Sequence, residues 1–284
     1  MKKLISTVIA TAALVAVAGI AGVADAKDWK KVRIASEGAY PPWNSTDASG
    51  KLIGFEIDAA NELCKRANLE CEIIATAWDG IIPGLTAGKY DAIMAGMSIT
   101  PKREKVIAFT ENYAQTPGRF CVLENSPLAS YMGKLEKLDL DRIGDAEKAE
   151  FASLKKLLKG KVVGVQVATT HFNFLDKYLG DAIEIRKYDT QENLDLDLFA
   201  GRIDAGSAGV GYWFPLLAKP AGKGLKLIGP GFIGDVIGKG VGAGMRKEDK
   251  DLNDIFSKAL RSMKKDGSLK KMSVQWFGYD LVPN

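Results

Sequence analysis

Four short segments of the sequence carry side chains able to hold a polar small molecule by hydrogen bonds, charge and stacking. They are EGAYPPWN at 37–44, AWDG at 77–80, MSITPKR at 97–103 and QVATTH at 166–171. The first offers a carboxylate at Glu37 beside aromatic rings, and the third places the hydroxyl of Ser98 near the guanidinium of Arg103. Each segment follows a run that is typical of a β-strand.

Each residue also has a plainer interpretation. Glu37 alone is a typical solvated acid, Trp78 a packing aromatic, Arg103 a surface charge and His171 a packing residue at a helix start. Their joint placement favours function, because ligands of doubly wound sheets bind at the carboxyl ends of strands, where helix N-termini present free N–H groups.

The runs before these segments alternate between strand and helix patterns. The first series comprises a strand at 32–36, a helix at 55–68, a strand at 71–78, a short helix at 81–89 and a strand at 90–96. A second series begins at 161 with KVVGVQV, TTHFNFLDKYLG, AIEIRKY, ENLDLDLFAG and RIDAGSA. This rhythm predicts two α/β lobes, each a mostly parallel sheet flanked by helices.

The connections suggest where the chain passes between the lobes. An extended segment at 114–122 is the expected first crossing, and Gly-rich 238–247 precedes two amphipathic helices that should return to the first lobe. We assign 27–117 and 215–284 to lobe 1 and 118–214 to lobe 2, with a charged insertion at about 126–152.

The first 26 residues predict a secretory signal peptide. Lys2 and Lys3 precede an apolar run from Val8 to Val23, and small residues end at Ala26, after which we expect cleavage. A membrane anchor is the alternative, but the run is shorter than the roughly 20 residues that span a bilayer. We therefore expect a periplasmic protein.

Charge and cysteine content exclude several classes of function. The formal charge of +4 is spread among interleaved acidic and basic residues, which argues against a nucleic-acid partner or a polybasic membrane patch. In an oxidising compartment, Cys64 and Cys71 could form a local disulfide, whereas Cys121 lies in an apolar run typical of a buried thiol. With one histidine in the chain, we expect no metal site and no cofactor.

Several strings resemble the family 3 extracellular solute-binding proteins of polar amino-acid ABC transporters, in the branch that binds lysine/arginine/ornithine, histidine, octopine or nopaline. They are EGAYPPWN, GFEIDAANELCKR, AWDGIIPGL, YDAIMAGMSITPKREKVIAFT and KKDGSLKKMSVQWFG. The resemblance implies a type II periplasmic-binding-protein fold with two hinge strands, and a monomer that hands a small-molecule ligand to a membrane permease. It also places the disulfide of the basic amino-acid binders at Cys64 and Cys71.

The resemblance assigns roles to residues of the first lobe. Arg103 would grip the ligand carboxylate in a bidentate pair, helped by Ser98 and the backbone at Ala95 and Gly96. Tyr40 and Trp78 would enclose the ligand side chain, and Glu37 would accept from a cationic head group, so that the expected ligand is arginine-like.

In the second lobe, the resemblance implies that Gln166, Thr169 and His171 lie on the binding loop. One departure matters, since Gly209 stands where the family carries an aspartate for the ligand α-amino group. An unpaired ammonium in a dry cleft is costly. The alternative ligand is therefore an opine, whose α-nitrogen is substituted and carries a second carboxylate, or another N-substituted arginine-like compound.

Two other functional classes remain. A few relatives resemble periplasmic dehydratases, but neither Glu37 nor His171 has a second titratable group placed beside it by spacing, so we expect no enzyme. The sensor lobe of a receptor is disfavoured because no transmembrane segment follows before Asn284.

Overall fold

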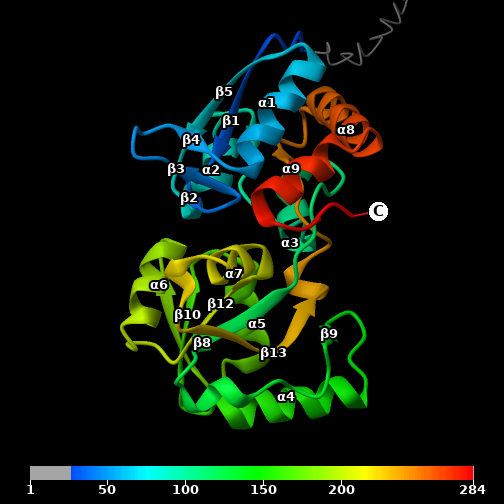
Figure 1. Ribbon diagram of the computed structural model, residues 1–284. Coiled ribbons are helices and arrows are strands. Elements are labelled where there is room, and N and C mark those ends of the chain that lie inside the picture. The colour runs from blue at the N-terminus through cyan, green and yellow to red at the C-terminus, as the bar shows by residue number, and fades with distance from the viewer. Residues whose placement is uncertain (1–26, 284) are drawn as a thin grey trace, which may run out of the picture.

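The computed structural model describes residues 27–283 and shows two α/β lobes joined by a narrow waist (Figure 1). The predicted signal peptide, residues 1–26, lies outside the described residues. None of the described helices is long and apolar enough to cross a membrane.

The first lobe is built on a five-stranded sheet. Its strands, in spatial order, are β5 (Glu70–Ala75), β1 (Lys31–Ser36), β6 (Ala92–Ile93), β14 (Gly244–Met245) and β7 (Ala108–Phe109). β5, β1 and β6 run parallel, while β14 pairs antiparallel with both neighbours. A small antiparallel sheet lies beside it, formed by β2 (Ala39–Tyr40), β3 (Asn44–Thr46) and β4 (Leu52–Ile53).

Helices from both ends of the chain cover the first sheet. They are α1 (Phe55–Ala67), η1 (Trp78–Gly80), α2 (Ile81–Thr86), α3 (Pro101–Glu104), α8 (Lys250–Lys265) and α9 (Ser268–Phe277). α8 buries Leu252, Phe256 and Leu260 at helical spacing, and these side chains share one core with α1 and α9. The two C-terminal helices therefore return to the first lobe, as the sequence predicts (Figure 1).

The second lobe is built on a six-stranded sheet. Its strands, in spatial order, are β11 (Glu184–Tyr188), β10 (Val162–Gln166), β12 (Ala205–Gly209), β8 (Gly118–Leu123), β13 (Leu225–Ile233) and β9 (Lys137–Asp139). Its helices are η2 (Pro127–Ser130), α4 (Asp145–Leu158), α5 (Thr170–Leu179), α6 (Gln191–Phe199), α7 (Val210–Leu217), η3 (Pro220–Gly222) and η4 (Asp235–Ile237). β11, β10 and β12 are parallel, and β8 is antiparallel to both of its neighbours.

Two sequence-based boundaries need correction. The second lobe does not end at residue 214, because the largely buried β13 pairs with β8 and so belongs to the second sheet. Residues 126–152 are not a separate insertion either. β9 forms the edge of the sheet, and α4 buries Phe151 and Leu154 in the core of the second lobe.

The two crossings run side by side. They meet in an antiparallel bridge between Ala114 and Val241, whose backbone N–H and C=O groups are joined at 2.8 Å. These two paired crossings correspond to the two hinge strands that the resemblance implies.

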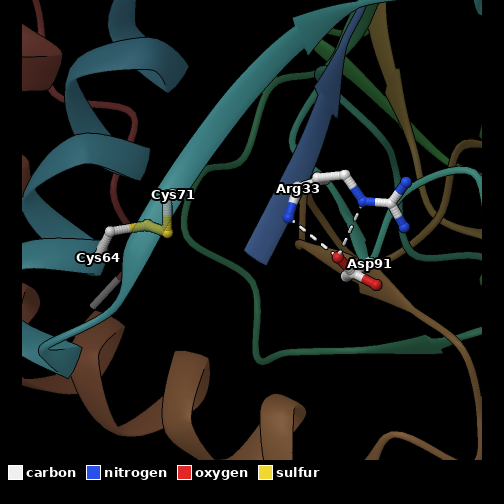
Figure 2. The surroundings of a disulfide bond; sticks show 4 residues. All are labelled: Arg33, Cys64, Cys71 and Asp91. Atoms are coloured by element: carbon white, nitrogen blue, oxygen red, sulfur yellow. Dashed lines mark hydrogen bonds and ion pairs between the residues drawn. A yellow bond between two sulfur atoms is a disulfide. The ribbon is translucent and has the colours of Figure 1, made fainter. Parts of the chain in front are cut away.

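A disulfide joins Cys64 at the end of α1 to Cys71 in β5 (Figure 2). On the neighbouring strand, the Arg33 backbone N–H donates to the Asp91 carboxylate at 3.0 Å, and its guanidinium lies 3.5 Å from the same carboxylate. Cys121 is buried and not oxidised, as expected. The covalent link fastens α1 to the sheet of the first lobe.

Candidate functional site

A cavity of about 650 Å³, counted with its open mouth, lies between the lobes. All eleven residues selected from the sequence line it. Seven come from the first lobe, namely Glu37, Tyr40, Trp78, Ala95, Gly96, Ser98 and Arg103. The other four, Gln166, Thr169, His171 and Gly209, come from the second lobe.

Arg103 reaches across the cavity from α3. Thr100 caps this short helix by accepting from the Arg103 backbone N–H at 3.2 Å. The guanidinium donates to the Ser98 carbonyl at 2.9 Å and to the Ala168 carbonyl of the opposite lobe at 3.2 Å. Burial lowers the pKa of Arg103 to about 10, so the side chain stays positively charged at neutral pH.

Aromatic rings form two walls of the cavity. The Trp78 ring centroid lies 5.3 Å from the Arg103 guanidinium carbon. Tyr40 stacks on Tyr212 of the second lobe with ring centroids 4.9 Å apart. The indole Nε1 of Trp78 is buried without a hydrogen-bond partner among the described residues, so an unused donor lies in this wall.

Glu37 is the acidic group of the cavity wall. Its carboxylate oxygen Oε1 accepts from the Gln166 amide of the opposite lobe at 2.5 Å. Burial raises the pKa of Glu37 to about 7, the charge of Glu56 adds to this rise, and the hydrogen bond from Gln166 partly opposes it. Glu37 is therefore poised to change its charge near neutral pH.

Glu56 itself does not line the cavity, but it fixes several segments that do. Its side chain is fully buried in the first turn of α1 and accepts from the Tyr113 hydroxyl. It also accepts from the Asn44 amide and the Gly96 backbone N–H, both at 2.7 Å. Gly96 has a φ of 61°, a left-handed conformation that suits glycine. One carboxylate thus holds the loop after β6, strand β3 and the first crossing.

The start of α5 lines the side of the cavity that the second lobe contributes. Thr169 caps the helix by accepting from the Phe172 backbone N–H at 3.1 Å, and its hydroxyl donates to the Gln166 carbonyl at 2.7 Å. Burial, and then the positive charge of Arg103, lower the pKa of His171 to about 4. His171 is therefore neutral, and its enclosed Nδ1 has no partner among the described residues.

The backbone at Gly209 leaves room in the wall. A Cβ atom there would lie 3.4 Å from Thr116 and 3.7 Å from the Tyr40 hydroxyl, which is ordinary contact distance. Nearby, the buried Ser207 hydroxyl and the Trp43 Nε1 have no hydrogen-bond partner among the described residues. This part of the wall thus offers donors and no carboxylate.

Seven further lining residues were not among the selected site residues, although Trp43 lies in the first of the four segments and Thr170 in the fourth. Trp43, Thr116 and Val241 come from the first lobe and the crossings, and Thr170, Gln191, Ser207 and Ile237 from the second lobe. Ser207 lies inside an expected strand, and Gln191 directly precedes an expected helix. Only the spatial order of the strands brings them to the cavity.

The chain matches bacterial extracellular solute-binding proteins, family 3, over residues 32–279. It belongs to this family. Octopine-binding periplasmic protein of Rhizobium meliloti is 40% identical over 273 residues, which is 90% of this chain and 92% of that protein. Histidine-binding periplasmic protein of Salmonella typhimurium is 36% identical, with 89% of each chain covered.

Among solved structures, an ancestral arginine-binding protein bound to arginine superposes with a TM-score of 0.73 and 30% identity, covering 87% of this chain and 98% of that one. Membership confirms the two-lobed fold and the function of a substrate-binding protein that serves an ABC importer.

Proposed function

We propose that this protein binds an amino acid or amino-acid derivative with a cationic, arginine-like side chain in the periplasm and delivers it to the permease of an ABC importer. The half-buried Arg103 carries this proposal, because its guanidinium contacts carbonyls of both lobes at the cavity and is a group that can pair with a ligand carboxylate. Glu37 supplies an acidic partner for the cationic head. The octopine-, histidine- and arginine-binding relatives support a ligand of this class.

The proposed mechanism is conformational. A ligand held by Arg103 and Tyr40 of the first lobe and by Thr169 and His171 of the second gains contacts only when the lobes are together. Ligand binding shifts the population toward the closed form by its difference in affinity for the two forms. Stacking of a guanidinium on Trp78 would add about 0.5–2 kcal/mol.

A second candidate ligand is an opine such as octopine. Gly209 provides no carboxylate for a free α-ammonium group, while the unpartnered donors of Ser207 and Trp43 suit an additional carboxylate. The 40% identical octopine-binding relative points the same way. Octopine keeps the cationic side chain of arginine, so the roles of Arg103 and Glu37 are the same for both candidates.

The test is isothermal titration calorimetry of the protein with L-arginine, octopine, L-lysine and L-histidine. Arg103→Ala should weaken the tightest ligand at least about 100-fold, as expected when one partner of a buried ion pair is removed. The exposed neighbour Lys102→Ala is the matched control and should bind as wild type does. Normal binding by a folded Arg103→Ala protein refutes the carboxylate role. Octopine binding more tightly than L-arginine selects the second candidate.

We also propose that the cavity binds its ligand without converting it. Among the described residues, neither Glu37 nor His171 forms a hydrogen bond with a second titratable side chain that could relay a proton. Recovery of L-arginine and octopine unchanged after prolonged incubation, measured by mass spectrometry, is the expected result. A new product would contradict this proposal.

A further inference from the structure

Gln191, the first residue of α6, presents a fixed hydrogen-bond acceptor to the cavity. Its side chain is 1% exposed, and its amide Nε2 donates to Oδ1 of Asp195 at 3.0 Å. An ionised carboxylate only accepts hydrogen bonds, so the amide must direct its NH₂ group to Asp195. The carbonyl oxygen of Gln191 is then left without a partner among the described residues.

Gln166 is held in the same way at the same corner. Its Nε2 donates to Glu37 at 2.5 Å and to the Asp189 backbone carbonyl at 3.1 Å, which uses both of its hydrogens. Its own carbonyl oxygen also remains free within the described part of the chain. Because Asp189 lies two residues before Gln191, the two glutamines line one corner of the cavity, beside Glu37.

Asp195 stands behind this corner without lining the cavity. It is 8% exposed, and its second oxygen accepts from the Tyr212 hydroxyl. Tyr212 in turn stacks on Tyr40 across the cleft. The Asp195 carboxylate therefore orients Gln191, which lines the cavity, and through Tyr212 it supports Tyr40. It also places a buried negative charge behind this part of the cavity wall.

We infer that Gln191 is a specificity-determining contact to a guanidinium head group and that Asp195 is the positioning residue that keeps its carbonyl turned toward the ligand. The inference rests on the proposed cationic ligand. A guanidinium is planar and carries five N–H donors, whereas an ammonium is a compact charge with three. Fixed acceptors on Gln166, Gln191 and Glu37 match the larger donor set, so the corner favours L-arginine over L-lysine.

The experiment compares L-arginine with L-citrulline, its uncharged isostere, by calorimetry. Gln191→Met should weaken L-arginine roughly 10- to 100-fold and L-citrulline only about 2- to 10-fold, because hydrogen bonds to charged groups are the stronger ones. Asp195→Asn should weaken L-arginine about 5- to 10-fold, since one buried charge near the cation is lost, and L-citrulline less than about twofold. The matched control is Glu192→Gln, an exposed carboxylate on the same helix that should leave both affinities unchanged.

The outcomes separate this inference from the function on which it rests. Wild-type protein that binds neither L-arginine nor octopine refutes both. If octopine is the tighter ligand, it replaces L-arginine in the variant series with the same expected losses. If the wild type binds L-arginine and Gln191→Met changes the ratio of the L-arginine and L-citrulline affinities by less than about twofold, the inference is refuted and the proposed function stands. Gln191→Met also decides the matter if denaturant curves show that Asp195→Asn does not fold.

Discussion

The ionisation of Glu37 should make the binding of a cationic ligand depend on pH. Burial, together with the charge of Glu56, raises the pKa of Glu37 to about 7. A cationic head group favours the ionised carboxylate, so below this pKa a proton must leave before the ligand is held. The affinity for L-arginine should therefore rise as the pH increases through 7 and level off above it.

The size of the effect follows from the fraction of Glu37 that is ionised. Each pH unit below the pKa costs about a factor of 10, so affinity should fall roughly 100-fold between pH 8 and pH 5. His171, with a pKa of about 4, and Arg103, with a pKa of about 10, keep their charge states over this range. Burial raises the pKa of Asp195 to about 6, and its protonation should add to the loss at the acidic end.

Calorimetry in two buffers of different ionisation enthalpy measures both the affinity and the protons released. Near pH 7 about half a proton should be released per L-arginine bound, because about half of the Glu37 side chains are then protonated. Glu37→Gln should abolish this component and leave only a weaker dependence near pH 6. An affinity for L-arginine that is constant between pH 6 and pH 8, or an unchanged profile in Glu37→Gln, would refute the reasoning.

Two further predictions concern stability. Replacing Cys64 and Cys71 by serine should cost roughly 2 kcal/mol, because the bond closes a short loop. By calorimetry, Tm should fall about 4–8 °C while ligand affinity stays the same. A variant that melts with the wild type would show that the bond does not restrain the unfolded chain. Tyr113→Phe removes one donor from the buried Glu56 and should cost about 1–3 kcal/mol in denaturant unfolding. A curve that coincides with wild type would mean that Glu56 does not depend on this hydroxyl.

Local patterns were sufficient to predict part of the helices and strands, among them β1, β10, α1 and α8. The alternation of charged and apolar residues from Lys31 to Ile34 in β1 and the helical spacing of apolar residues in α8 are both visible in the sequence. The spatial order of the strands is not, since it depends on pairing between distant residues. No element was predicted for the run LKLIGPGFI, and only its pairing with β8 assigns it to the second lobe.

The residues of the cavity could likewise be predicted from the sequence only in part. Glu37 follows β1 directly, Ser98 and Arg103 lie on the segment after β6, and a rule about strand ends is enough to select them. Gln191 was missed because the helix pattern indicates a start at residue 192. The contacts of Asp195 with Gln191 and of Tyr212 with Tyr40 join residues that no local pattern links.

Because Glu56 lies outside the cavity, supporting the cavity wall and contacting the ligand are carried out by different residues. Glu56 braces Asn44, Gly96 and Tyr113 from behind, without touching the space in which cargo would be held. Side chains such as Trp78 and Ser207 can therefore be exchanged while this brace stays intact. A library that varies the cavity wall and leaves the brace untouched is a rational way to redirect this receptor to new cargo.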